Sequence, residues 1–161
     1  MNFKTLSLVA ALLLVAGCAQ KGAETGTAGG TGGAAGANAG QTSAQQLQQQ
    51  LASVGDRIYF AFDKSDITPE SRQVLSKQAD LLKQNPSVTV TIEGHCDERG
   101  TREYNLGLGE RRANATKQAL VALGIAANRI NTISYGKERP AVLGHNEQAW
   151  AQNRRAVTVI Q

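Results

Sequence analysis

Two kinds of hydrophobic spacing alternate along residues 57–161. Apolar residues with a spacing of two, typical of a strand with one buried face, run through 57–62 and 88–93, and shorter apolar groups at 130–135 and 156–160 indicate two further strands. Helical spacing occupies 69–84 and 103–123, and a short helix is expected at 147–153. The order is βαβαβ followed by a short helix and a strand. We therefore predict an α/β sandwich (α+β) over residues 55–161, with helices packed on one mixed sheet.

Helix boundary signals support this assignment. Thr68 is a suitable N-cap, Pro69 suits the first helical position, and Glu70 places an acid in the first turn. The Asn85-Pro86 pair should end that helix. Gly124 is placed to cap the C-terminus of the longer helix.

The first residues have the order of an export signal. Lys4 precedes the apolar run Leu6–Ala16, and small residues follow up to Cys18. In a helix this run spans about 16 Å, roughly half of a bilayer core, which disfavours a permanent transmembrane helix. The stretch Leu14-Val15-Ala16-Gly17-Cys18 resembles a bacterial lipobox, which implies a lipoprotein signal peptide over 1–17 and a lipidated Cys18; an ordinary secretory signal is the alternative.

Residues 18–54 carry little that could form a core. Gly, Ala and Thr dominate the first part and Gln the second, so we expect a flexible tether between Cys18 and the folded domain. The spacing of Leu47, Leu51 and Val54 leaves a short helix over 43–54 open.

Charge and cysteine content narrow the function classes. The chain has 17 Lys and Arg against 13 Asp and Glu, a net charge of +4, and the basic residues are scattered among acids. This distribution disfavours a nucleic-acid binder. Neither Cys18 nor Cys96 belongs to a CxxC pair or a Cys/His array, so a disulfide scaffold, a zinc site and any other cofactor are not predicted.

Residues 94–113 carry the most specific motif. Gly94-His95-Cys96-Asp97-Glu98-Arg99-Gly100-Thr101, followed by Tyr104-Asn105-Leu106 and Leu108–Ala113, resembles the OmpA-like C-terminal domain family. With the lipobox, the chain is similar to the lipid-anchored members of that family. The resemblance implies a protein on the periplasmic face of the outer membrane that binds peptidoglycan noncovalently. It also implies membership of the Tol system, with TolB as a partner, and a role in envelope integrity and cell division.

The resemblance also implies a binding site. Asp97 would meet the ammonium, and Arg112 the carboxylate, of a meso-diaminopimelate side chain in a peptidoglycan stem peptide. A guanidinium suits the carboxylate because it can donate two parallel hydrogen bonds. The other residues that the family motif implies for this pocket are Phe62, Asp63, Thr101, Asn105 and Leu108. For three of them a structural role stays open: Phe62 as a core aromatic, Asn105 as a cap or loop brace, and Leu108 as packing.

Enzyme chemistry is the main alternative class. Glu93, His95 and Asp97 alternate and could hold a metal if the strand continued, but no second histidine is close in sequence. Cys96 beside His95, or with His145, could form a nucleophile and base, yet adjacent strand residues face opposite sides. We therefore predict a binding protein; a protein-interaction module of the envelope without direct wall contact is the alternative.

Overall fold

The structure is a computed structural model that describes residues 35–161, with side chains described from residue 43 onward. The predicted signal peptide over 1–17, the lipidation site Cys18 and the first part of the tether lie outside the described residues. The elements in chain order are α1 (Ala35–Val54), β1 (Arg57–Tyr59), α2 (Pro69–Gln84), β2 (Val90–His95), α3 (Arg102–Ala122), a 3-10 turn (Ala127–Arg129), β3 (Ile130–Gly136), α4 (Glu147–Asn153) and β4 (Arg155–Ile160).

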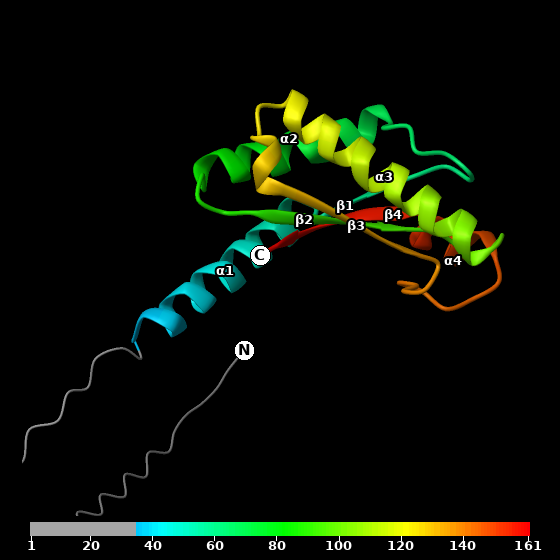
Figure 1. Cartoon of the computed structure of the whole chain (residues 1–161), viewed down its shortest axis with the longest axis horizontal. Coiled ribbons are helices and arrows are strands. Elements are labelled where there is room, and N and C mark those ends of the chain that lie inside the picture. The colour runs from blue at the N-terminus through cyan, green and yellow to red at the C-terminus, as the bar shows by residue number, and fades with distance from the viewer. Residues whose placement is uncertain (1–34) are drawn as a thin grey trace, which may run out of the picture. The chain divides into compact units, whose positions relative to one another are not determined.

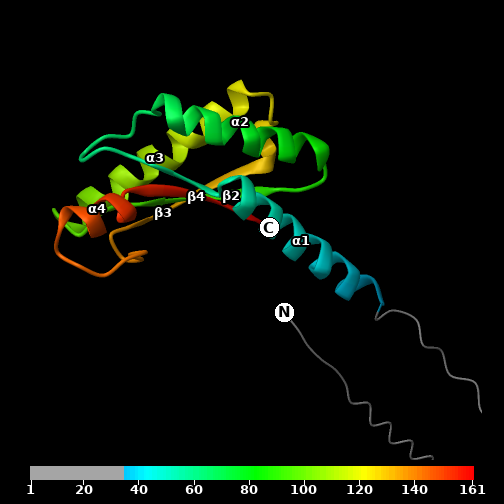
Figure 2. The same ribbon diagram turned by 180° about the vertical axis from the view of Figure 1, so that it is seen from behind.

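The four strands form one mixed sheet in the order β1-β4-β2-β3. β2 pairs with β3 in parallel, and β4 runs antiparallel to both of its neighbours, β1 and β2. Helices α2 and α3 lie on the same face of the sheet in both views (Figures 1 and 2). The predicted α/β sandwich, with strands and helices alternating along the chain, is confirmed.

The helix boundaries follow the capping signals. The Thr68 side chain accepts a hydrogen bond from the backbone N–H of Ser71 at the start of α2, and that helix ends at Asn85. After α3, Gly124 adopts a positive φ of 97° and its N–H donates to the Val121 carbonyl over 2.9 Å. Local sequence chemistry therefore sets where these helices begin and end.

The core lies between the sheet and the helices α2 and α3. It is built from apolar residues that are almost completely buried: Ile58, Leu75, Leu82, Val90, Ile92, Ala113, Leu120, Ile125 and Ile130. Near the end of β2, helix α3 lies much closer to the sheet. A Cβ on Gly94 would lie 1.9 Å from the Gly109 carbonyl oxygen, and a Cβ on Gly109 would lie 2.3 Å from Ser134 Oγ. This glycine pair lets α3 rest on the sheet at the level of the candidate site.

Helix α1 is longer than the sequence predicted. The composition indicated a flexible segment, with a helix left open only over 43–54, whereas the helix begins at Ala35. Leu47 and Leu51 are buried, and Gln48 Oε1 accepts a hydrogen bond from the Ile160 N–H at 2.9 Å. These tertiary contacts stabilise a helix that glycines would weaken in isolation. No helix within residues 35–161 is long and apolar enough to cross a membrane.

Strand β1 is shorter than the predicted 57–62. It ends at Tyr59, although the Phe60 N–H still donates to the Arg154 carbonyl at 2.9 Å. Phe60 is buried, but Phe62 is 57% exposed, so Phe62 is not a core aromatic. Asp63 then adopts a positive φ of 56°, which turns the chain away from the sheet. The turn leaves Phe62 and Asp63 at the rim of a pocket.

Candidate functional site

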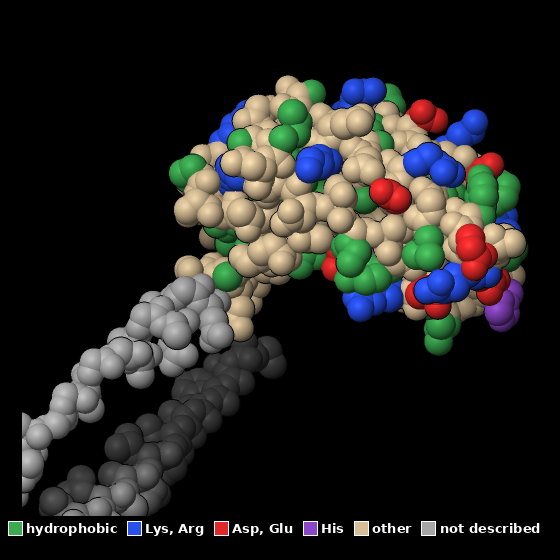
Figure 3. Space-filling model, viewed as in Figure 1, with side chains coloured by type: hydrophobic (Ala, Val, Ile, Leu, Met, Phe, Trp, Pro, Cys, Tyr) green, Lys and Arg blue, Asp and Glu red, His purple; other side chains and the backbone are tan. Residues whose placement is uncertain are grey.

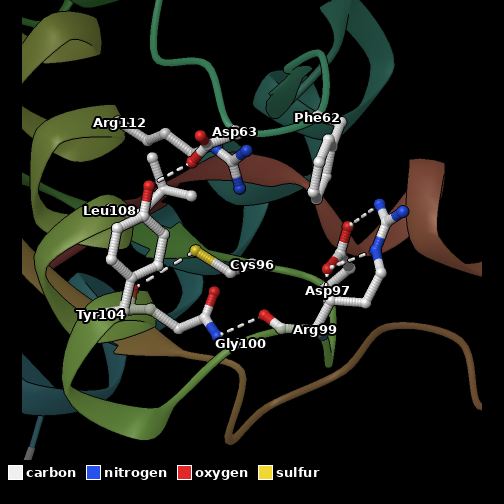
Figure 4. Close-up of a pocket in the computed structure, with 10 residues that line it drawn as sticks. Phe62, Asp63, Cys96, Asp97, Arg99, Gly100, Tyr104, Leu108 and Arg112 are labelled. Atoms are coloured by element: carbon white, nitrogen blue, oxygen red, sulfur yellow. Dashed lines mark hydrogen bonds and ion pairs between the residues drawn. The ribbon is translucent and has the colours of Figure 1, made fainter.

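A pocket of about 170 Å³ lies where β1 and β2 end and α3 begins (Figure 4). Its lining includes six of the seven predicted site residues, namely Phe62, Asp63, Asp97, Asn105, Leu108 and Arg112, together with Cys96, Arg99, Gly100 and Tyr104. Thr101, the seventh, lies beside the pocket as the N-cap of α3, where its hydroxyl accepts from the Tyr104 N–H. The structure thus brings together side chains that are separated by up to 50 positions in the sequence.

Arg112 projects from α3 and is 1% exposed. Its Nε donates to the Lys64 carbonyl at 2.9 Å, Nη1 to the His95 carbonyl at 2.8 Å and Nη2 to the Ala61 carbonyl at 3.2 Å. Burial lowers the pKa of Arg112, and the nearby Asp97 carboxylate partly opposes this. Within residues 35–161 its guanidinium forms no ion pair, so three N–H groups hold the backbone and two remain for a ligand.

Asp97 lies two residues after the end of β2 and is 4% exposed. Its Oδ1 accepts from Arg99 N at 3.1 Å and Arg99 Nε at 3.2 Å, and its Oδ2 accepts from Arg99 Nη2 at 2.6 Å and Arg154 Nη1 at 3.4 Å. Burial alone would raise the pKa of the Asp97 carboxyl, but the hydrogen bonds from Arg99 and Arg154 hold it below its usual range. The carboxylate is therefore ionised and fully bonded.

Arg99 lies between two aromatic rings. Its guanidinium carbon is 3.9 Å from the centre of the Phe62 ring and 4.1 Å from a ring centre of Trp150, which belongs to α4. Trp150 is fixed in turn, because its Nε1 donates to Glu98 Oε1 at 2.9 Å. Phe62, Asp97 and Arg99 lie side by side in Figure 4. On the face shown in Figure 3, acidic and basic side chains gather at the α4 end of the sheet.

Sequence reasoning missed this stacking. Arg99 belongs to the motif that carried the resemblance, but nothing in the local pattern predicted its contact with Trp150, which lies on another helix. The lone tryptophan of the chain was the one available signal, since such a residue close to a charged loop invites a cation–π contact.

The opposite wall of the pocket carries a second carboxylate. The Tyr104 hydroxyl donates to Asp63 Oδ1, and this bond raises the pKa of Tyr104. Leu108, 5% exposed, adds an apolar surface. Asn105 holds the loop before α3, because its Nδ2 donates to the Arg99 carbonyl at 2.8 Å and the Thr101 carbonyl at 3.0 Å. Asn105 is thus a loop brace as well as a pocket residue.

Cys96 and His95 are poorly placed for catalysis. The Cys96 thiol donates to the Asn105 carbonyl at 3.3 Å, and burial raises its pKa, which favours the unreactive protonated form. His95 Nε2 lies 3.7 Å from Glu93 Oε2, whereas Asp97 is bonded to the two arginines in and beside the pocket. Among residues 35–161 no three His, Cys, Asp or Glu side chains are grouped to hold a metal.

The geometry of the pocket suits a small ligand group that carries one positive and one negative charge. Two carboxylates, a buried guanidinium with spare donors, and an apolar surface surround a space large enough for the end of an amino-acid side chain. Opposite charges on facing walls would orient a zwitterion in one direction.

Comparisons with known proteins agree with this architecture. Residues 59–154 match the model of the OmpA family. A peptidoglycan-associated lipoprotein of Brucella melitensis is 56% identical over 108 residues, covering 67% of this chain, and one of Mesorhizobium japonicum is 46% identical over 152 residues, covering 94%. The matched segment spans 64% of the Brucella protein's length and 88% of the Mesorhizobium protein's.

Solved structures show the same fold. The crystal structure of the peptidoglycan-associated lipoprotein from Burkholderia pseudomallei superimposes with a TM-score of 0.64 at 44% identity, covering 66% of this chain and 90% of that one. The C-terminal domain of Helicobacter pylori MotB superimposes with a TM-score of 0.61 at 18% identity, covering 66% and 84% respectively. The second match, at that identity, supports the fold alone.

Proposed function

The chain belongs to the OmpA family, and from that premise we propose that it binds peptidoglycan through the pocket at the ends of β1 and β2. The observation that carries the proposal is the convergence of Asp97, Asp63 and Arg112 on one small pocket in a chain with close relatives named peptidoglycan-associated lipoprotein. A binding role also fits the bonded, protonated state of the Cys96 thiol, which disfavours nucleophilic catalysis.

The ligand group is the free end of meso-diaminopimelate in a stem peptide. This end carries an ammonium and a carboxylate on one carbon, joined to the peptide by methylenes. Arg112 receives the carboxylate with its two spare N–H groups, and Asp97 receives the ammonium. Phe62 and Leu108 cover the methylenes. A stem peptide with lysine lacks the side-chain carboxylate, so it offers Arg112 no anion beside the ammonium and binds more weakly.

The domain is joined to the outer membrane through its N-terminus. The lipobox-like sequence ending at Cys18 and the Gly-rich segment after it support a lipid anchor and a tether. The lipidated N-terminus is then inserted in the outer membrane, and the folded domain binds the cell wall. Modest affinity suffices, because many anchored copies face a polymeric ligand. Through the Tol system, with TolB as a partner, this reversible link supports envelope integrity and constriction during division.

A sedimentation assay with purified cell-wall sacculi tests the binding role. We expect full-length Asp97→Asn to remain in the supernatant, because the variant loses the charge that meets the ammonium. Asp80→Asn is the matched control, since Asp80 is exposed on α2 and pairs only loosely with Lys83 at 3.9 Å. Equal sedimentation of Asp97→Asn and the unaltered chain would refute the site.

A further inference from the structure

The Asp97 carboxylate has no acceptor position left for a ligand. A carboxylate offers about four lone-pair positions, and the four hydrogen bonds from Arg99 and Arg154 take them all. Arg99 accounts for three of these bonds, two of them from its guanidinium. A ligand ammonium can therefore reach Asp97 only if a guanidinium leaves.

Arg99 is the partner that can leave. Its side chain is 30% exposed, whereas that of Arg154 is 8% exposed. Arg154 is also tied elsewhere, since Nε donates to the Phe60 carbonyl at 3.0 Å and Nη2 to Glu147 Oε1 at 2.6 Å. The Arg99 backbone N–H can keep its bond to Asp97 while the guanidinium moves out from between its two rings.

We propose that the Arg99–Asp97 ion pair is a specificity element of the pocket, which opens only for a ligand that carries both an ammonium and a carboxylate. This inference rests on the proposed function and deepens it. The ligand ammonium replaces the Arg99 guanidinium on Asp97, and the ligand carboxylate, already held by Arg112, offers an oxygen to the released Arg99. The exchange conserves ion pairs, because each charge finds a new partner.

A ligand with a single charge cannot make this exchange. A lysine ammonium would displace Arg99 from Asp97 and leave its guanidinium with only the loose contact to Glu147 at 4.0 Å, next to the buried charge of Arg112. A lone carboxylate would gain no access to Asp97. The pocket thus distinguishes diaminopimelate from lysine through the Arg99 guanidinium, which competes for Asp97, as well as through direct contacts. Specific sites commonly include such an element that acts against the wrong ligand.

The resulting prediction runs against simple intuition, because removing a pocket arginine should improve the binding of a wrong ligand. We would measure by calorimetry the affinity of the full-length chain for two tripeptides, L-Ala-γ-D-Glu-meso-diaminopimelate and L-Ala-γ-D-Glu-L-Lys. In Arg99→Gln we expect the lysine peptide to bind about tenfold more tightly than to the unaltered chain, since Asp97 loses its competitor. The preference for the diaminopimelate peptide should fall accordingly.

Arg102→Gln is the matched control. It removes the same charge three residues away, but Arg102 pairs with Glu138 at 3.3 Å and does not line the pocket. Both affinities should stay unchanged in this variant. Arg99→Gln should still fold, because Arg154 and the backbone N–H of residue 99 continue to bond Asp97.

Trp150 supplies an independent readout. It is the only tryptophan in the chain, and its ring contacts the Arg99 guanidinium. Saturation of the unaltered chain with the diaminopimelate peptide should shift tryptophan emission, and Arg99→Gln should show little shift. An unchanged lysine-peptide affinity in Arg99→Gln, or an unchanged emission at saturation, overturns the inference. Failure of the unaltered chain to bind the diaminopimelate peptide contradicts the proposed function itself, and this inference with it.

Discussion

His95 should make the stability of the domain depend on pH between 7 and 4. The side chain is 2% exposed, and neither ring nitrogen has a hydrogen-bond partner in the described structure. Burial, together with the positive charges of Arg155, Arg139 and Arg57, lowers the pKa of His95 from 6.5 to about 4. The histidine is therefore neutral in the folded protein.

The sign and size of the effect follow from proton linkage. Between pH 6.5 and 4 the unfolded chain binds a proton at His95 that the folded protein excludes, so stability falls as the pH falls. A pKa lowered from 6.5 to about 4 corresponds to about 3 kcal/mol, at roughly 1.4 kcal/mol per pH unit. This is a large part of the stability of a small domain.

The assay is urea unfolding of the full-length chain at pH 7 and pH 4, compared with His95→Phe. Phenylalanine preserves a ring beside Tyr135, whose centroid is 5.5 Å from that of His95, and leaves no polar atom unsatisfied. The loss of stability from pH 7 to pH 4 should be about 3 kcal/mol smaller in His95→Phe. Parallel pH profiles for His95→Phe and the unaltered chain would refute the reasoning.

Three further predictions concern the site, its support and the anchor. Arg112→Ala should abolish wall binding and lower the free energy of unfolding by about 3 kcal/mol, because three backbone carbonyls lose their donor. In the same urea titration, Arg111→Ala, at an exposed position, should change this free energy by less than about 0.5 kcal/mol. Gly109→Ala should lower the thermal midpoint, since its Cβ would lie 2.3 Å from a hydroxyl oxygen of β3, while Gly107→Ala, with its nearest neighbour at 3.5 Å, should raise it. Cys18→Ser should move the protein from the membrane to the soluble fraction of lysed cells, and retention in the membrane would contradict the lipid anchor.

The dual role of Arg112 changes how its variants are interpreted. Sequence reasoning gave this arginine a ligand contact and no structural role. The structure buries it and bonds it to the carbonyls of Ala61, Lys64 and His95. Loss of binding in Arg112→Ala therefore reports on both the ligand contact and the shape of the pocket. Asp97→Asn and Arg99→Gln are cleaner tests, since each retains part of its bonding.

Features that depend on near neighbours in the chain could be predicted from the sequence. The Thr68-Pro69 start of α2, the glycine after α3 and the short helix at 147–153 each follow from residues within one or two turns. The exposed position of Phe62 could not be predicted from periodicity, because the alternation of Ile58, Phe60 and Phe62 continues beyond the point where β1 leaves the sheet.

Features that depend on contacts between residues far apart in the chain were missed, because local sequence patterns do not encode such contacts. Helix α1 forms across a glycine-containing segment because Leu47 and Leu51 pack on the domain. The motif predicted which residues surround the pocket. It did not predict that Asp97 already accepts hydrogen bonds from Arg99 and from Arg154, which lies 57 positions further along the chain. Such pairings depend on how β4 and α4 meet the end of β2, which no local pattern encodes.

The most direct test of the central claim is calorimetric titration of the unaltered full-length chain with the L-Ala-γ-D-Glu-meso-diaminopimelate tripeptide, with the lysine tripeptide titrated in parallel. The proposed site predicts saturable one-to-one binding of the first peptide and at least about tenfold weaker binding of the second, since only the first carries a carboxylate beside the ammonium at the end of its side chain, where Arg112 can bind it. Equal affinity for the two peptides, or no binding of either, would contradict recognition of diaminopimelate by this pocket.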